Sequence, residues 1–386
     1  MCKVEYKLVQ QVKVVTTHHF ADTIQEILKE ENYQKPLIVI DNFLLGQATI
    51  QNMLDRLDKE DVDYTIYDRI VPDPPIELID SGADFFKENQ CDSILAIGGG
   101  SVIDAARAIN IVRYHGGSAR DYVFDKQVPS FCPGLISCPT TSGTGSELSN
   151  AAVITDTETE EKLAILADNA VSEYAVLCPE LVVSLPVGQT IITGLDVFSH
   201  AAEAYTSTLS SPVVDAICEK IMFLVVKYLP KAVRNGQDLE ARERMLIAAA
   251  LGGWVINNGG THLGHSQAHI VGAKLHIPHG MACGYALPGT LLFTAQVEPK
   301  KVREIGNILG CEFPADVTDM EIGEITAQAY KEFRDEQLGL PAFDAQGISR
   351  DQLLDLVDEV VNERFASNAP MEVTPELVTQ LLERFG

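Results

Sequence analysis

Apolar runs rich in β-branched residues recur along the first half of the chain, and they set the strongest limit on its fold. Five such runs precede Pro186, at residues 35–41, 92–100, 134–141, 151–156 and 175–185. Helical patterns lie between some of them, at residues 23–31 and 77–89. Continuous apolar strands that alternate with helices predict a parallel sheet covered by helices on both faces.

The pattern changes after Pro186, where Ala, Leu, Glu and Lys recur at helical spacing and strand-like runs are few. Residues 351–365 are predicted to form one amphipathic helix, because their apolar positions repeat at i, i+3 and i+4. A further helix is expected after Thr374, an N-cap residue that Pro375 follows. We therefore predict an α/β domain over residues 1–187 and an all-helical domain over residues 188–386, with a ligand cleft between them.

The charge balance limits the partners of the chain. Its 55 acidic and 29 basic residues give a formal net charge of −26, which repels nucleic acids and anionic membranes. No apolar run approaches the roughly 20 residues of a membrane helix, and residues 1–11 lack the pattern of a signal peptide. A cytoplasmic protein is expected. The eight cysteines include no C-x-x-C pair, and no disulfide framework is predicted.

Histidines cluster in the second half of the chain. Five of the nine fall within residues 262–279. Neutral imidazole nitrogens are common metal ligands, so this cluster is a candidate metal site. His265 and His269 are four residues apart and would share a helix face. Pro278 is expected to end that helix, which lets His279 turn back toward the same place.

A second fragment supplies a carboxylate, since Asp196 and His200 are also four residues apart on a predicted helix. One carboxylate and three imidazoles around a divalent cation would leave a net charge of +1, and the cation would remain a useful Lewis acid. Spacing alone does not select the ligands, and seven residues stay open as candidates: Asp196, His200, His262, His265, His269, His276 and His279.

Three polar loops follow predicted strands. Gly98, Gly99, Gly100 and Ser101 form a turn before a predicted helix, where a phosphate could approach the backbone. This turn is not the G-x-G-x-x-G fingerprint, since Ile103 occupies the third glycine position. The loop 139–147 is rich in hydroxyls, and a strand ends at Asp41, where a carboxylate can bind ribose hydroxyls and repel a 2′-phosphate. Together the loops indicate a Rossmann-like nucleotide-binding domain.

These motifs resemble the iron-containing (group III) alcohol dehydrogenases along essentially the whole chain. The matching segments are GGGSVID (98–104), PTTSGTGSE (139–147), PELVVSLP (179–186), TGLDVFSHAAEAY (193–205) and HSQAHIVGAKLHIPHG (265–280). The last is the most specific, because it reproduces the family spacing His-x3-His-x9-His and ends in Pro-His-Gly.

The resemblance implies roles for individual residues. It assigns the metal to Asp196, His200, His265 and His279, and it makes His269 the catalytic histidine beside the nicotinamide. The cofactor residues that it implies are Asp41, Gly99, Gly100, Ser101, Thr140, Thr141, Thr144, Lys162 and Leu181. His262 and His276 match no shared functional position. The chain departs from the family pattern at Asp73-Pro74, at Arg107, where Lys is common, and at Cys178-Pro179.

The activity that follows from the resemblance is reversible hydride transfer between an alcohol and NAD. The metal would act as a Lewis acid on the substrate oxygen, and His269 would relay the released proton. Family likeness favours Fe(II), although three imidazoles and a carboxylate also suit Zn(II), Mn(II), Co(II) or Ni(II). A small alcohol or aldehyde substrate and a homodimer are expected.

Two alternatives remain open. The first is an NAD- and zinc-dependent enzyme of the glycerol dehydrogenase or dehydroquinate synthase type. A phosphorylated substrate of the latter needs a basic pocket, whereas residues 255–285 contain one Lys, Lys274, and no Arg. The second is a non-catalytic metal-binding relative that has kept the fold.

Overall fold

The computed structural model describes residues 6–123, 127–159 and 161–386, which form two compact units. The sheet unit comprises Gln10–Thr141 and Gly145–Ser184. The helical unit comprises Leu185–Gly386, the short segment Ser142–Thr144 and the described residues before Gln10. The predicted boundary after residue 187 falls in the first turn of helix α5 (Val187–Thr206).

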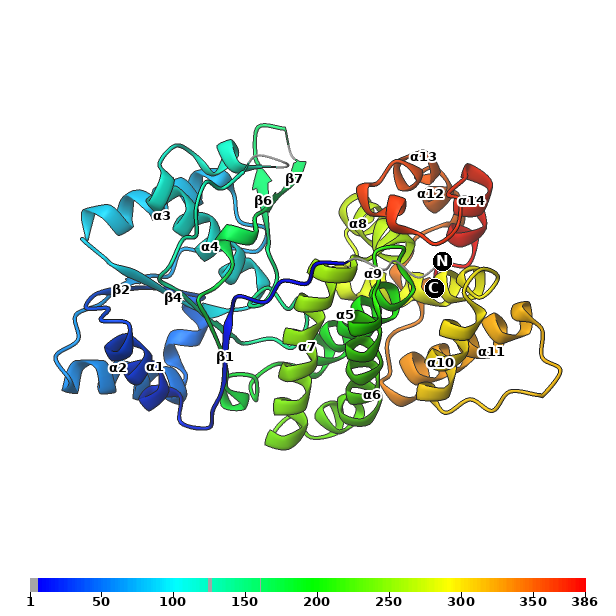
Figure 1. Cartoon of the computed structure of the whole chain (residues 1–386), viewed down its shortest axis with the longest axis horizontal. Coiled ribbons are helices and arrows are strands. Elements are labelled where there is room, and N and C mark those ends of the chain that lie inside the picture. Colours follow the sequence, from blue (N-terminus) through cyan, green and yellow to red (C-terminus); the bar gives the residue numbers. More distant parts are fainter. Residues whose placement is uncertain (1–5, 124–126, 160) are drawn as a thin grey trace. The chain divides into compact units, whose positions relative to one another are not determined.

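A six-stranded parallel sheet forms the centre of the sheet unit (Figure 1). Its order is β1-β8-β5-β4-β2-β3, and every neighbouring pair is parallel. The strands are β1 (Lys13–Thr16), β2 (Pro36–Ile40), β3 (Thr65–Tyr67), β4 (Ser93–Gly98), β5 (Leu135–Pro139) and β8 (Tyr174–Leu177). All residues of β2, β4, β5 and β8 are buried, as continuous apolar runs predict for a sheet that is covered on both faces.

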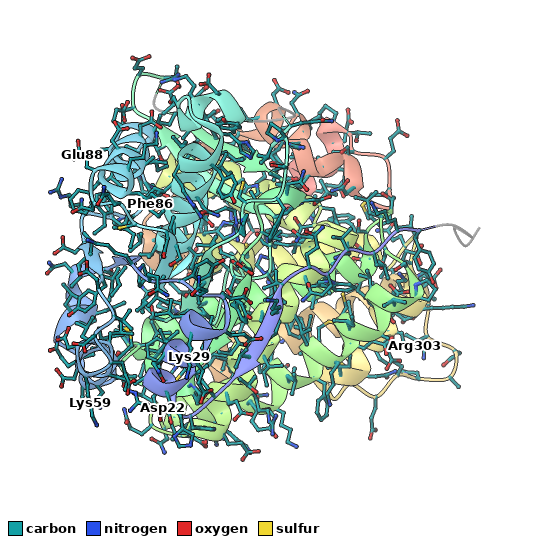
Figure 2. All side chains as sticks on the ribbon, turned by 60° about the vertical axis from the view of Figure 1, so that its left-hand side comes forward. Asp22, Lys29, Lys59, Phe86, Glu88 and Arg303 are labelled. Carbon is teal, nitrogen blue, oxygen red and sulfur yellow. The ribbon has the colours of Figure 1, made fainter. Side chains whose placement is uncertain are left out.

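Helices cover both faces of this sheet, and alternate residues of each strand contact opposite cores. Leu37 belongs to a core with residues of α3 (Ile76–Glu88) and α4 (Gly100–His115). Its neighbour Ile38 belongs to a core with residues of α1 (Phe20–Glu30) and α2 (Ala48–Lys59). Figure 2 shows charged side chains of α1 and α2 at the surface, among them Asp22, Lys29 and Lys59. The predicted Rossmann-like α/β architecture is confirmed.

Two of the predicted strands differ in detail. Residues 151–156 form β6 (Ala151–Asp156), which pairs with β7 (Glu161–Leu166) in an antiparallel hairpin outside the main sheet. Alternate residues of β6 are fully buried, which is the pattern of a half-buried strand rather than of a central parallel one. The run 175–185 is a strand only to Leu177, because Pro179 begins the 3-10 helix η4 (Pro179–Leu181).

The described residues of the helical unit contain no strand. They form α5 and then α6 (Pro212–Arg234), α7 (Leu239–Gly259), α8 (Leu263–Leu275), α9 (His279–Thr294), α10 (Pro299–Leu309), α11 (Asp319–Glu332), α12 (Arg350–Leu354), α13 (Val357–Val361) and α14 (Pro375–Glu383). Helix α5 is the most enclosed, since every residue from Leu195 to Thr206 is buried. It packs against α6, α7 and α9. The predicted all-helical second half is confirmed.

Of the two helices predicted near the end of the chain, one is confirmed and the other is wrong. Helix α14 begins at Pro375, and the Thr374 side chain accepts a hydrogen bond from the Leu377 N–H, as the capping pattern predicts. The single helix predicted over 351–365 is wrong, because α12 and α13 are separate. Helix α13 ends at Val361, and the extended backbone of Glu363 starts a new 3-10 turn, η7 (Arg364–Asn368).

Among the described residues, none of the helices combines the length and apolar character needed to cross a membrane.

Candidate metal centre and nucleotide-binding edge

Helix α5 carries the first pair of candidate ligands. Asp196 and His200 lie one turn apart on the same face, and both are almost fully buried. The start of the helix is held by Arg242, whose guanidinium donates to the Leu185 carbonyl and to the Thr190 hydroxyl at 3.1 and 2.9 Å. The pair therefore sits on a fixed and enclosed element.

The second pair of ligands comes from α8 and α9, which a short turn connects. Helix α8 carries His265 and ends at Leu275, before Pro278, as predicted. His276 adopts a left-handed conformation with φ of 56°, and His279 is the first residue of α9. A Cβ atom on Gly280 would lie 2.2 Å from the Ile192 carbonyl oxygen. Only glycine therefore lets the start of α9 approach α5 closely enough to bring His279 beside Asp196.

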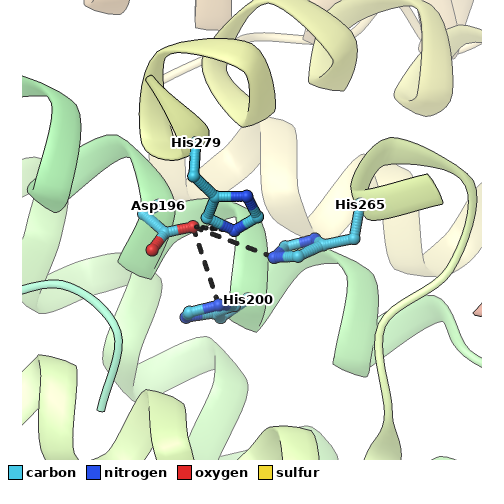
Figure 3. Close-up of side chains that lie close together, drawn as sticks. All are labelled: Asp196, His200, His265 and His279. Carbon is cyan, nitrogen blue, oxygen red and sulfur yellow. Dashed lines mark ion pairs between the residues drawn. The ribbon is translucent and has the colours of Figure 1, made fainter. Parts of the chain in front are cut away.

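The four predicted ligands converge on one point (Figure 3). Their ligating atoms all lie within 4.8 Å of one another. Asp196 Oδ1 is 3.6, 3.8 and 3.5 Å from the Nε2 atoms of His200, His265 and His279, respectively. These separations exceed hydrogen-bond distances, and they leave the atoms facing a shared centre rather than paired with one another.

Two of these atoms are buried without a hydrogen-bond partner, namely Asp196 Oδ1 and His265 Nε2. Unpaired buried polar atoms are rare and destabilising in native proteins. A cation at the shared centre would satisfy both. Three nitrogens and one carboxylate oxygen are also a suitable donor set for a divalent transition metal, so the residues present fit such an ion.

The electrostatics of His200 and Asp196 favour their ligating protonation states. For His265 they do not, because burial acts to lower its pKa but the Glu203 carboxylate outweighs burial and raises that pKa. Burial lowers the pKa of His200 to about 4, which keeps its imidazole neutral. Burial acts to raise the pKa of Asp196, but the three neighbouring imidazoles outweigh it and hold that pKa below its ordinary value. His279 is the most open of the four, with a side chain that is 42% exposed.

His269 lies beside this group without belonging to it. Its ring is 5.3 Å from the ring of His279 and nearly parallel to it, and 6.0 Å from the ring of His265. The structure therefore brings the histidine that was assigned to catalysis next to the candidate ligands. His262, by contrast, is fully buried and lies 2.8 Å from the Thr206 hydroxyl through its Nε2 atom.

Sequence reasoning missed two carboxylates in this region. Glu203 Oε1 lies 2.7 Å from His265 Nδ1, and Glu363 Oε1 lies 3.1 Å from His269 Nδ1. Glu203 could have been found, because it follows Asp196 by seven residues and His200 by three, and so shares their helix face. Glu363 gives no such signal, since 94 residues separate it from His269.

Most of the predicted cofactor residues follow the carboxyl ends of adjacent strands. Asp41 follows β2, the glycine turn follows β4, Thr140 and Thr141 follow β5, and Leu181 follows β8. Since β8, β5, β4 and β2 are parallel neighbours, these segments share one edge of the sheet. The chain direction across the sheet reverses between β2 and β4, which is where doubly wound sheets bind nucleotides.

The turn between β4 and α4 is shaped for a close approach. Helix α4 begins at Gly100, directly after β4, and its first N–H groups are available at its positive end. A Cβ on Gly99 would lie 3.3 Å from the Thr141 methyl group, so the glycine turn and the hydroxyl-rich loop are close neighbours. Ser101 is the second residue of the helix and is half-buried.

Three predicted cofactor residues lie elsewhere or face inward. Lys162 is on β7 of the separate hairpin, and its ammonium group lies 2.8 Å from the Asp73 carboxylate. Thr144 is exposed and belongs to the segment that is grouped with the helical unit. Leu181 is only 1% exposed and is part of the core that contains α1 and α2, so it offers little surface to a ligand.

Comparisons with known proteins agree with this arrangement. Residues 12–179 match iron-containing alcohol dehydrogenase, and residues 190–386 match the C-terminal region of the Fe-containing alcohol dehydrogenase family. The NAD-dependent methanol dehydrogenase of Bacillus methanolicus is 32% identical over 357 residues, which are 92% of this chain and 93% of that protein.

Solved structures give the same result. The alcohol dehydrogenase from Oenococcus oeni superposes with a TM-score of 0.91 at 28% identity, over 99% of this chain and all of that chain. The sulfoacetaldehyde reductase from Bifidobacterium kashiwanohense, solved in complex with NAD+, gives a TM-score of 0.88 at 26% identity, over 99% of both chains. The chain therefore belongs to the iron-containing alcohol dehydrogenase family.

Proposed function

We propose that this protein is a metal-dependent alcohol dehydrogenase that transfers hydride reversibly between a small alcohol and NAD. The observation that carries the proposal is the convergence of Asp196, His200, His265 and His279, whose ligating atoms lie within 4.8 Å of one another. Family membership supports an alcohol oxidoreductase, and the buried unpaired atoms of this cluster support a bound divalent cation.

The four residues would hold the cation, which would supply Lewis acidity toward the alcohol oxygen. The three imidazoles contribute no charge, and the single Asp196 carboxylate leaves the site with a net positive charge that attracts an alcoholate. The exposed side chain of His279 marks the side on which the cluster is open. We propose Fe(II) as the native ion because of the family, and the same donors also suit Zn(II).

NAD would bind along the carboxyl edge of the sheet. The N-terminus of α4, at Gly99, Gly100 and Ser101, would bind the pyrophosphate through backbone N–H groups and the positive end of the helix dipole. Asp41, which follows β2 and is exposed, would accept hydrogen bonds from the ribose hydroxyls and repel a 2′-phosphate. A relative named as NAD-dependent and a structural neighbour in complex with NAD+ support this choice of cofactor.

His269 would take part in proton transfer. Its Nδ1 atom lies 3.1 Å from the Glu363 carboxylate, an acceptor, so the proton on the ring is held at Nδ1 and Nε2 keeps a free lone pair. Nε2 is then the atom that could accept the proton released by the alcohol. The side chain is about one-third exposed, which gives that proton a route to solvent.

The proposal is tested by measuring alcohol-dependent NADH formation over a panel of short alcohols and diols, with metal content determined on the same sample. We expect activity with Fe(II), and loss of both activity and bound metal in His265→Ala. His276→Asn is the matched control, because His276 lies just beyond the same helix and Asn tolerates its left-handed backbone. Metal binding without NADH formation from any alcohol would instead favour a non-catalytic relative.

A further inference from the structure

Glu203 is a buried carboxylate one turn beyond His200 on α5 that has no place in the proposed ligand set. It is 1% exposed, and it is not among the four residues whose ligating atoms converge. An ionised carboxylate is costly to bury unless its oxygens are fully engaged. Its contacts therefore indicate what it does.

One oxygen of Glu203 caps helix α8. Oε2 accepts hydrogen bonds from the backbone N–H groups of His262, Gly264 and His265, at 2.8, 3.0 and 3.2 Å. These groups belong to the first turn of α8 and the residue before it, which have no partners within the helix. Glu203 thus supplies from α5 the cap that α8 lacks in its own sequence, because His262 makes no side-chain capping bond.

The other oxygen of Glu203 contacts His265, a proposed metal ligand, on the side of the ring that faces away from the shared centre. Oε1 lies 2.7 Å from Nδ1 of His265, while Nε2 of the same ring points toward Asp196 at 3.8 Å. A carboxylate only accepts, so the ring proton must be on Nδ1. The Nε2 lone pair is then directed at the shared centre, and that atom is buried and otherwise unpartnered.

The chain is shaped to allow this contact. A Cβ on Gly264 would lie 2.4 Å from Glu203 Oε1, so a larger residue at this position would displace the carboxylate. Behind it, His262 lies 2.8 Å from the Thr206 hydroxyl and 3.8 Å from Glu203 Oε2. The start of α8 is therefore fixed to α5 at two successive points, Glu203 and Thr206.

We propose that Glu203 is a positioning residue that sets both the ring tautomer and the location of His265, and that it thereby determines the metal affinity of the site without ligating the metal. The inference rests on the proposed function in one respect, namely that the four-residue cluster binds a divalent cation. Groups that orient a metal-ligating histidine typically affect metal affinity by ~10- to 100-fold.

The test compares Co(II) binding by the metal-free full chain and its Glu203→Gln variant. Affinity is measured by competition with a chromophoric chelator, and the visible absorption of bound Co(II) reports its ligands. The amide keeps the size of the side chain and one acceptor oxygen. The three backbone N–H groups hold that oxygen, so the NH2 group lies next to Nδ1. This group donates, which moves the ring proton to Nε2, where the proton blocks the metal. We expect Co(II) affinity to fall by ~10- to 100-fold.

Glu219→Gln is the matched control, because Glu219 is a partly buried helical carboxylate whose partner is the Tyr205 hydroxyl of α5, at 2.8 Å. This control should bind Co(II) as the unmodified protein does. If Glu203→Gln does not fold, Gly264→Ala replaces it in the test, since the added methyl group displaces the Glu203 carboxylate but keeps its charge. It should weaken Co(II) binding and alter the Co(II) spectrum.

The two proposals fail in different ways. The positioning role would be overturned if Glu203→Gln bound Co(II) with the affinity and the spectrum of the unmodified protein. The same holds for Gly264→Ala where that variant must replace Glu203→Gln. Absence of Co(II) binding by the unmodified chain would overturn the metal site itself. A loss of thermal stability in the metal-free variant with unchanged Co(II) affinity would show that Glu203 only caps α8, and it would also overturn the inference.

Discussion

At the residue scale, the contact between His269 and Glu363 has a consequence for catalysis. Glu363 Oε1 lies 3.1 Å from His269 Nδ1, and its Oε2 accepts a hydrogen bond from the Phe365 N–H. The Phe365 ring packs against His269 at 5.4 Å. Glu363 and the turn that it caps therefore hold the imidazole from two sides.

We expect Glu363→Ala to lower kcat on the order of tenfold, part of the 10²- to 10⁴-fold that acid–base groups contribute, because the ring of His269 loses its orienting acceptor. Glu363→Gln should recover part of this loss, since the amide oxygen can still accept from Nδ1. Metal content should not change in either variant. Glu359→Gln is the control, because Glu359 is an exposed neighbour that pairs with Lys274. An unchanged kcat in Glu363→Ala would exclude the orienting role.

Glu203 and Glu363 differ in whether local sequence spacing predicts their contacts with the histidines. Asp196, His200 and Glu203 recur at helical intervals, so a helix predicted over this segment places all three on one face. Glu363 reaches His269 only because α13 and η7 fold back on α8. Contacts of that kind depend on tertiary packing, which a single sequence does not encode in any local pattern.

At the element scale, the buried strands β2, β4, β5 and β8 were predictable, because burial on both faces demands long apolar runs. The edge strands β1 and β3 were not predicted, since their residues are mostly exposed or partly buried and form no such run. The hairpin of β6 and β7 was not predicted, since β6 reads as another strand of the parallel sheet and the segment of β7 (Glu161–Leu166) begins with two charged residues. Thr155 of β6 bonds through its N–H to the Pro74 carbonyl, 81 residues earlier, in the loop that also contains Asp73. β6 is thus attached to the loop that precedes α3.

A buried arginine joins α4, β6 and the end of the hydroxyl-rich loop. The guanidinium of Arg107, fully buried, donates to the carbonyls of Ser146, Ala151 and Ala170. A lysine at this position would lack this fork of donors. Glu147 follows in the loop and is 2% exposed, and burial raises its pKa from 4.5 to about 7.

The raised pKa of Glu147 predicts that stability falls as pH rises. Between pH 4.5 and 7 the unfolded chain releases this proton while the folded chain keeps it, so the free energy of unfolding decreases through that window and levels off above it. A shift of this size corresponds to about 3 kcal/mol. We expect Glu147→Gln to lose less thermal stability than the unmodified protein between pH 5 and pH 8, as followed by circular dichroism.

Glu88→Gln provides the comparison, because Glu88 is an exposed carboxylate at the end of α3 (Figure 2). Its pH dependence should match that of the unmodified protein. Parallel curves for Glu147→Gln and the unmodified protein would show that Glu147 does not carry the pH dependence.

At the scale of the whole molecule, the proposed ligands are confined to one of the two units. Asp196 and His200 lie on α5, His265 on α8 and His279 on α9, and all three helices belong to the helical unit. A metal that binds only the folded state stabilises it by RT ln(1 + [L]/Kd), which is about 4 kcal/mol at a thousand times Kd. This stabilisation should act on the unit that contains the ligands.

We therefore expect removal of the metal by a chelator to lower the melting temperature, and added Zn(II) to restore it. Hydrogen exchange should become faster on metal removal in α5, α8 and α9, because the metal joins these three helices. The sheet strands β2 and β4 should exchange unchanged, since they contain no ligand. Asp196→Asn should show neither the shift nor the change in exchange. Equal changes in both units would mean that the metal acts on the whole chain, whereas protection limited to the three helices would place its effect where the four side chains converge.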